Sequence, residues 1–184
     1  NVVGPFQMLR AARSLLEASE RGAVLMVSSI AGVTGIGSSV AYAASKGALN
    51  AMTLYFAREL APHVRVNAVC PGLIDTDLVE FITAGGPVLD SYAENTPIDR
   101  VGEPEDIAAL VRFLVGPEAT WLTGQVITVD GGQSLRRGPS LDVLRSLIRE
   151  SEATAVFWNR RYEPTAIARD TRIKTELAHD GIEC

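Results

Sequence analysis

The chain has 184 residues, of which 47% are hydrophobic and 21% charged, and its formal net charge is −5 at pH 7. This length and composition indicate one soluble α/β domain. The acidic balance argues against a general nucleic-acid-binding protein, which usually presents a basic face. No apolar run approaches the roughly 18 residues that a membrane span needs, and no secretory signal precedes the first predicted helix. We therefore expect a cytoplasmic protein with no nucleic-acid or membrane partner.

Helical and strand patterns alternate along most of the chain. Apolar residues recur at helical spacing in the first two helical segments, whereas residues 23–27 are a short, continuous apolar run of the kind found in buried parallel sheets. Proline ends the second helix, and acidic residues in the first turn favour the third. The predicted helices span residues 6–19, 42–61 and 103–115, and the predicted strands span residues 23–27, 64–69 and 125–129.

A possible acid/base site lies around the second helix. Tyr42 and Lys46 are four residues apart, so a helix places both side chains on one face. A fixed positive charge beside a phenol favours its ionised form. Ser29 follows the first predicted strand, and the carboxyl ends of parallel strands are where open α/β sheets bind ligands. These three groups suit polarising a carbonyl and transferring a proton to it.

Several motifs together resemble the short-chain dehydrogenase/reductase family, whose order and spacing they follow over residues 1–134. They are Ser28-Ser29 with Gly32, Tyr42-x-x-Ser45-Lys46, Arg65-Val66-Asn67 before Pro71-Gly72, Thr123-Gly124-Gln125, and Val129-Asp130-Gly131-Gly132. Residues 100–107 are similar to 3-oxoacyl carrier-protein reductases without being diagnostic. The resemblance implies a Rossmann-like, doubly wound parallel sheet, of which this chain holds only the later strands and helices.

The resemblance also implies roles for individual residues. In the family the serine orients the substrate, the tyrosine is the acid/base, and the lysine supports the tyrosine and holds the nicotinamide ribose; these roles map onto Ser29, Tyr42 and Lys46. Asn1 matches a fourth catalytic residue, which feeds a proton relay; the alternative is a frayed terminal residue. The cofactor implied is NAD or NADP, and the sequence does not distinguish them. The residues expected to contact it are Tyr42, Lys46, Pro71, Gly72, Ile74 and Thr76.

One feature of the family is missing from the sequence. No glycine-rich turn between a first strand and a first helix is present to receive the cofactor pyrophosphate. Gly32, Gly35 and Gly37 follow Ser29 and are interpreted as a flexible loop instead. Each βαβ unit takes roughly 30 residues, so the absent units amount to on the order of 100 residues. We expect the chain to be the carboxyl-terminal part of a larger polypeptide.

Other segments leave alternatives open. Small residues on the helix at 42–61 would permit close approach of a second copy of the chain, as in a homodimer or homotetramer. The alternative is that this face of the helix packs on its own sheet. Residues 76–100 have the composition of a mobile lid that selects the substrate. Within it, apolar side chains could line a pocket or form the core of a short helix; they are Leu78, Val79, Phe81 and Ile82.

Residues 135–184 form an extension of unknown role. A short amphipathic helix is predicted at 141–148. Trp158 to Tyr162 mix aromatic and basic side chains, which suits contact with a partner or an anionic group, or packing of a tail. Cys70 and Cys184 indicate no disulfide framework, and His63 and His179 lack a second ligand at metal spacing, so no metal site is predicted.

Two functional hypotheses follow. The first is an enzyme, an NAD(P)-dependent oxidoreductase that interconverts a small-molecule secondary alcohol and a ketone, with Tyr42 as the acid/base. The second is a non-catalytic interaction or scaffold protein, because the chain lacks the cofactor-binding first half and its three-stranded sheet would leave one edge bare. The sequence does not specify the substrate.

Overall fold

The computed structural model describes the chain except for residues 36, 78, 80–86, 136–138 and 159–161. Two compact units are present, Asn1–Ser134 and Leu135–Cys184. Each has its own secondary structure and its own interior, and each is therefore described by itself.

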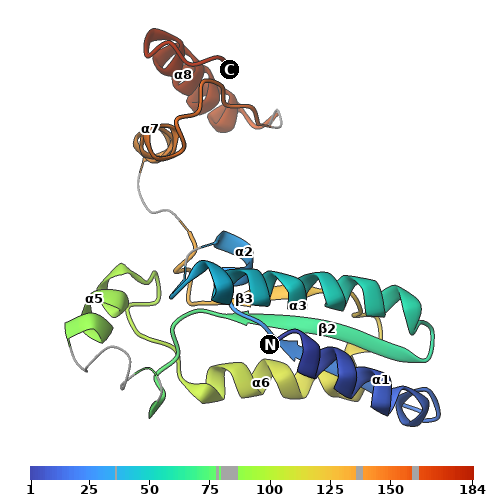
Figure 1. Cartoon of the computed structure of the whole chain (residues 1–184). Helices are drawn as coiled ribbons and strands as arrows, with labels where there is room; N and C mark the ends of the chain where they lie inside the picture. The colour runs from blue at the N-terminus through green and yellow to red at the C-terminus, as the bar shows by residue number, and fades with distance from the viewer. Residues whose placement is uncertain (36, 78, 80–86, 136–138, 159–161) are drawn as a thin grey trace. The chain divides into compact units, whose positions relative to one another are not determined.

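The first unit is built on a three-stranded parallel sheet (Figure 1). Its strands are β1 (Gly22–Val27), β2 (Val64–Pro71) and β3 (Val126–Val129), and they lie in the order β1-β2-β3. Val24 pairs with Val66 and Val69 with Ile127 in the register. The central strand β2 is buried along most of its length, as expected for a strand inside a parallel sheet. The predicted parallel sheet is confirmed.

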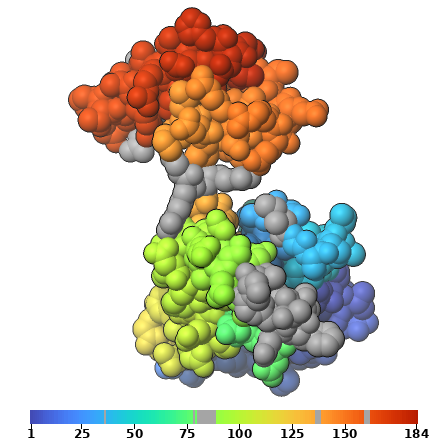
Figure 2. Space-filling model, turned by 90° about the vertical axis from the view of Figure 1, so that its left-hand side faces the viewer, coloured from blue at the N-terminus to red at the C-terminus, as the bar shows by residue number. Residues whose placement is uncertain are grey.

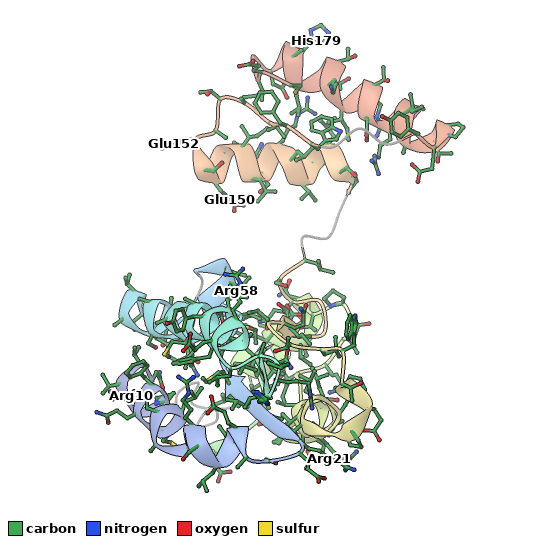
Figure 3. All side chains as sticks on the ribbon, turned by 90° about the vertical axis from the view of Figure 1, so that its right-hand side faces the viewer. Arg10, Arg21, Arg58, Glu150, Glu152 and His179 are labelled. Carbon is green, nitrogen blue, oxygen red and sulfur yellow. The ribbon has the colours of Figure 1, made fainter. Side chains whose placement is uncertain are left out.

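Two helices share one face of this sheet, α1 (Val3–Glu17) and α3 (Val40–Glu59). The Phe6 ring of α1 lies 6.0 Å from the Phe56 ring of α3, and Arg13 on α1 forms an ion pair with Glu59 on α3. Arg10 and Arg58 stay exposed on the outside of these helices (Figure 3). One core lies beneath both helices and contains Leu9, Met26, Leu49, Phe56, Ala57, Leu60, Val64, Val66 and Ala68.

The opposite face packs against α6 (Pro104–Val115) and the 3-10 helix η1 (Pro117–Ala119) that follows it. Arg65 points to this face from β2 and donates hydrogen bonds to the carbonyl oxygens of Leu114, at 2.7 Å, and Gly116, at 3.1 Å. Glu103 and Asp106 form a capping box that begins α6, as the acidic start of this segment predicts.

Two predicted features of the first unit need correction. The glycine segment after β1 is a loop only in part, because residues Ala31–Thr34, including Gly32, form a short helix, α2, which ends at Gly35 with φ of 75°. The second strand extends two residues past its predicted end at residue 69, and Pro71 is its last residue. In the segment predicted to be a lid, α5 (Pro87–Asn95) forms a helix. Figure 2 shows α5 and the start of α6 in one continuous stretch of surface.

The second unit contains α7 (Ser140–Ser151) and α8 (Pro164–His179). Arg145 of α7 forms ion pairs with Glu176 and Asp180 beside α8, and Ala155 and Glu183 pair as a parallel bridge across α8. Helix α8 was not predicted from the sequence. Charged side chains on the outside of the unit, among them Glu150, Glu152 and His179, are labelled in Figure 3.

None of the helices in the described ranges is both long and apolar enough to cross a membrane.

Candidate active site

Tyr42 stands in the first turn of α3, at the point where the helix begins. Ser39 has an extended backbone, and its Oγ accepts a hydrogen bond from the Tyr42 N–H at 3.1 Å, which satisfies one of the free amides of the helix start. Lys46 follows one turn later, and its Nζ lies 5.7 Å from the centroid of the Tyr42 ring. The predicted juxtaposition of phenol and ammonium is therefore present.

Two hydrogen bonds hold this turn of α3 against the end of β1. The Lys46 Nζ donates to the carbonyl oxygen of Val27 at 2.9 Å. In return, the Ser28 Oγ donates to the carbonyl oxygen of Lys46 at 3.0 Å. Because one bond uses the lysine side chain and the other its backbone, the position of Lys46 is fixed at the carboxyl edge of the sheet.

Ser29 follows Ser28 and lies half-buried at the same edge. Its Oγ accepts a hydrogen bond from the Ala31 N–H at 3.1 Å, so the hydroxyl proton can be donated to another group. The turn that carries Ser29 contacts α3 directly, since a Cβ added to Gly32 would lie 2.6 Å from the backbone carbon of Lys46. A glycine is required at this close approach.

Asn1 lies exposed near the same turn of α3. Its Nδ2 donates to the Ser45 Oγ at 3.1 Å, and that hydroxyl donates to the carbonyl oxygen of Tyr42 at 2.8 Å. The structure thus brings Asn1 to the backbone of the tyrosine turn.

The residues predicted to contact the cofactor form a second group, at the carboxyl end of β2. The Pro71 carbonyl accepts from the Ile30 N–H at 3.0 Å, which links this group to the serine turn. The Gly72 N–H donates to the Val129 carbonyl at 3.0 Å. A side chain at Gly72 would meet Asp130 at 2.8 Å, so the chain passes this point only without a Cβ.

Ile74 forms an isolated parallel bridge with Gly102. The bridge uses the carbonyl of Leu73, which accepts from Gly102 N–H at 3.1 Å, and the N–H of Asp75, which donates to Gly102 O at 2.8 Å. The N–H and carbonyl of Ile74 itself therefore face away from Gly102. Thr76 is the last residue of this group, and its Oγ1 accepts from the Val79 N–H at 3.4 Å.

A cavity of about 190 Å³ adjoins Ile74. Tyr92 lines it from α5, Thr96 lines it from just after that helix, and Val129 and Gly131 line it from the end of β3. Of the apolar residues predicted either to line a pocket or to form a helix core, Leu78, Phe81 and Ile82 fall outside the described residues.

The surroundings shift the pKa values of two titratable groups near these residues. Burial raises the pKa of the Cys70 thiol, which stays free at the end of β2. The Arg100 guanidinium, with Nη1 2.7 Å from Asp106 Oδ2, holds the pKa of the Asp106 carboxyl well below its ordinary value, and the Glu103 N–H adds to this effect. Neither group belongs to the predicted acid/base set.

Three supporting residues were not given these roles from the sequence. Ser28 anchors the Lys46 backbone, Ser39 caps α3, and the Gln133 Oε1 accepts from the Leu73 N–H at 3.1 Å. A serine just before a predicted helix is a recognisable cap signal. Nothing in the local sequence indicates the contact of Gln133, which joins residues 60 positions apart.

Most of the matches found by comparison with known proteins fall on the first unit. A family model described as Enoyl-(Acyl carrier protein) reductase matches residues 1–134. A second model, described as DNA photolyase, matches residues 122–184, about a third of the chain.

A tropinone reductase homolog of Arabidopsis thaliana is 41% identical over 133 residues, which are 72% of this chain and 50% of that protein. The chain thus spans about half the length of the relatives it matches. A short-chain type dehydrogenase/reductase from Mycobacterium ulcerans superposes with a TM-score of 0.69 at 40% identity, covering 80% of this chain and 54% of that one.

Two further similar structures hold cofactors. A 4-hydroxyisoleucine dehydrogenase complexed with NADH is 29% identical, with a TM-score of 0.67, and the match covers 73% of this chain and 56% of that one. The Pseudomonas aeruginosa RhlG/NADP active-site complex is 31% identical, with a TM-score of 0.66 and the same two coverages.

Proposed function

The chain belongs to the short-chain dehydrogenase/reductase family, and from this premise we propose that it carries the acid/base site of an NAD(P)-dependent oxidoreductase that interconverts a secondary alcohol and a ketone. The observation that supports this most strongly is the juxtaposition of Tyr42 and Lys46 at the carboxyl end of β1, with Nζ 5.7 Å from the ring centroid. The serine turn is packed against the same turn of α3.

Each of the three side chains has a separate task in this proposal. In the reductive direction Tyr42 gives its phenolic proton to the ketone oxygen, and in the oxidative direction it takes the proton back. Ser29 donates a hydrogen bond to the same oxygen and orients it. Lys46 places a positive charge beside the phenol, which stabilises the phenolate that remains after transfer.

The residues present fit the nicotinamide end of a dinucleotide. Lys46 offers an ammonium to a ribose, and Ile74 offers a backbone N–H and carbonyl that the bridge to Gly102 leaves unused. Gly72 lets the chain pass close to Asp130 beside them. Pro71 and Thr76 flank this stretch. When bound, the cofactor supplies or accepts the hydride. We assign no residue of this chain to the pyrophosphate, and the residues named here do not discriminate NAD from NADP.

Asn1 is proposed as a relay residue. Its amide reaches the Ser45 hydroxyl, which in turn contacts the Tyr42 carbonyl, so an ordered polar path joins it to the tyrosine turn. Loss of this amide would slow reprotonation of the site more than binding of the substrate.

A homo-oligomer is also part of the proposal, with α3 at the interface between copies. Its outward face exposes apolar side chains, including Leu54 at 45% and Tyr55 at 62%. Sedimentation of the protein over a range of concentrations tests this part, and a monomer at every concentration would contradict it.

The second unit is proposed to stand outside this reaction. Its isolated parallel bridge joins Ala155 and Glu183, which lie on either side of α8 in the sequence. Together with the match to a DNA photolyase model, this supports a separate structural unit. Removal of residues 135–184 should therefore leave the reductase rate of the first unit's site unchanged in a protein that contains the whole family domain.

The experiment that tests the proposed reaction uses a polypeptide that contains the whole family domain around these residues. Oxidation of NADH and of NADPH is followed with a panel of ketones, including tropinone and a 3-oxoacyl thioester. The proposal predicts turnover of at least one ketone with a preference for one cofactor. Binding of neither cofactor would contradict it and favour a non-catalytic interaction protein.

A further inference from the structure

Ile74 has a backbone N–H that donates to no group in the part of the chain that the structure describes. Both neighbouring N–H groups have acceptors. The Asp75 N–H donates to the Gly102 carbonyl at 2.8 Å, and the Leu73 N–H donates to the Gln133 Oε1 at 3.1 Å. An N–H without an acceptor between two anchored residues is available to a ligand, and its direction depends on both anchors.

The two anchors differ in kind. The bond to Gly102 joins two backbones, whereas the bond to Leu73 comes from a side chain and therefore depends on which residue occupies position 133. The amide oxygen of glutamine accepts a hydrogen bond from an N–H, but an apolar side chain of the same size does not. The Leu73 anchor is thus a property of Gln133 in particular.

The turn after β3 holds Gln133 in place. The Asp130 carboxylate accepts from the Gly132 N–H at 3.0 Å and from the Ser134 N–H at 2.7 Å, and the Gln133 N–H donates to the Asp130 carbonyl at 3.0 Å. A Cβ at Gly72 would lie 2.7 Å from the Gln133 Oε1, so the absence of a side chain there lets the amide reach its partner. The turn therefore presents the amide oxygen from a closed, hydrogen-bonded backbone.

Packing alone does not hold this segment. Leu73, Ile74 and Gln133 all line the cavity of about 190 Å³. Well-packed protein interiors contain few voids larger than a water molecule, so a segment beside such a cavity has room to shift. The hydrogen bond from Gln133 is what limits movement of Leu73 on this side.

We propose that Gln133 is a positioning residue for the cofactor, because its hold on the Leu73 N–H directs the free N–H and carbonyl of Ile74 toward the nicotinamide end of the dinucleotide. The inference rests on the proposed function, in which Ile74 contacts that end. Gln133 acts through Leu73 and is assigned no contact of its own with the cofactor.

The test separates the two ends of the cofactor. NADH, NADPH and the fragments that lack the nicotinamide, ADP-ribose and its 2′-phosphate, are titrated into a protein that contains the whole family domain. Gln133→Leu removes the acceptor with little change of size and should weaken binding of the preferred cofactor by about 3–10-fold, the effect of one hydrogen bond. Binding of the matching fragment should stay near wild type, because the fragment lacks the group that Ile74 would contact. A general loss of structure would weaken both.

Gln125→Leu is the matched control. Gln125 is exposed just before β3, and its Nε2 donates to the Thr123 carbonyl at 3.1 Å. It therefore lies at the opposite end of the same strand from Gln133, and its loss removes one side-chain hydrogen bond without touching the Leu73 anchor. This variant should bind cofactor and fragment as the wild-type protein does.

Amide hydrogen exchange in the wild-type protein gives a second readout, which needs neither a folded variant nor a substrate. Without cofactor, the Leu73 N–H should be protected at least about tenfold more than the Ile74 N–H, relative to the rates of each in an unfolded chain. Addition of the preferred cofactor should slow exchange at Ile74 by at least about tenfold. In Gln133→Leu, the protection of Leu73 should be lost.

The outcomes distinguish this inference from the proposed function. A wild-type protein that binds neither NADH nor NADPH would contradict both. If the wild-type protein binds a cofactor, the positioning role alone is overturned when Gln133→Leu weakens cofactor and fragment equally or weakens neither. It is also overturned if Leu73 exchanges as freely as Ile74 before cofactor is added.

Discussion

Lys46 on α3 donates a hydrogen bond from Nζ to the carbonyl oxygen of Val27, the last residue of β1, at 2.9 Å. This bond joins the helix that carries the candidate acid/base residue to the sheet edge where that residue would act. It also orients the ammonium, which lies 5.7 Å from the Tyr42 ring. The packing of α3 on β1 therefore determines where the candidate site lies.

The close approach of the serine turn to α3 predicts an unequal response to two glycine substitutions. Gly32→Ala would place a Cβ 2.6 Å from the Lys46 backbone, so α3 must move and the free energy of unfolding should fall by about 1–3 kcal/mol. Gly47→Ala, whose Cβ meets nothing closer than 3.7 Å, should instead leave stability equal or raise it by up to about 1 kcal/mol. Urea unfolding of both variants checks this, and equal losses would contradict it.

The cap of α3 predicts a second effect. Ser39→Ala removes the oxygen that accepts from the Tyr42 N–H and should lower the free energy of unfolding by about 1 kcal/mol. Ser39→Asp keeps an acceptor at the same place and should restore most of the loss. Thermal unfolding of the three proteins, followed by circular dichroism, tests this prediction. Equal unfolding midpoints would show that the cap does not contribute to stability.

The ion pair at the start of α6 predicts a dependence of stability on acid. The Arg100 guanidinium lowers the pKa of Asp106 below its ordinary value of 3.8, so the folded state is favoured whenever the carboxylate is ionised in both states. This contribution is present above pH 3.8 and is lost as the pH falls below it. Asp106→Asn should thus lower the free energy of unfolding at pH 7.

Denaturant unfolding at several pH values tests the sign of this effect. The difference between the wild-type protein and Asp106→Asn should shrink as the pH falls below 3.8. A difference that stays constant across the acid range would show that the ion pair is not its cause.

The two thiols should react very differently. Cys70 is buried at the end of β2, and burial raises the pKa of its thiol, so little thiolate is available to an alkylating reagent. Cys184 is partly exposed. Mass spectrometry after brief iodoacetamide treatment should find Cys184 modified at least about 100-fold faster than Cys70, and addition of denaturant should abolish the difference.

The sheet and the juxtaposition of Tyr42 and Lys46 could be predicted from local patterns. The apolar run of β1 indicates a buried strand, and the spacing of Tyr42 and Lys46 places them on one helix face whatever that helix packs against. These features depend on neighbours in the sequence, and the structure confirms them. The roles of Ser29, Tyr42, Lys46 and Asn1 in catalysis remain predictions.

Other features depend on contacts between distant residues and could not be predicted. The glycine segment after β1 forms α2, which packs against the Lys46 turn. The requirement for glycine at position 32 therefore comes from a residue that is distant in the sequence. Likewise, Gln133 reaches the backbone of Leu73 across 60 positions. Helix α8 has a broken apolar pattern, and its buried Ile173 and Leu177 face an interior that only the fold of the second unit defines.

The most direct measurement compares Tyr42→Phe with Tyr55→Phe in a protein that contains the whole family domain, with ketone reduction followed by oxidation of the cofactor. Both tyrosines lie on α3, and Tyr55 is 62% exposed, so its change tests only the loss of a hydroxyl from this helix. Tyr42→Phe should lower kcat by about 10²–10⁴-fold, whereas Tyr55→Phe should keep the wild-type kcat. A Tyr42→Phe protein that keeps its reductase rate would contradict the assignment of Tyr42 as the acid/base.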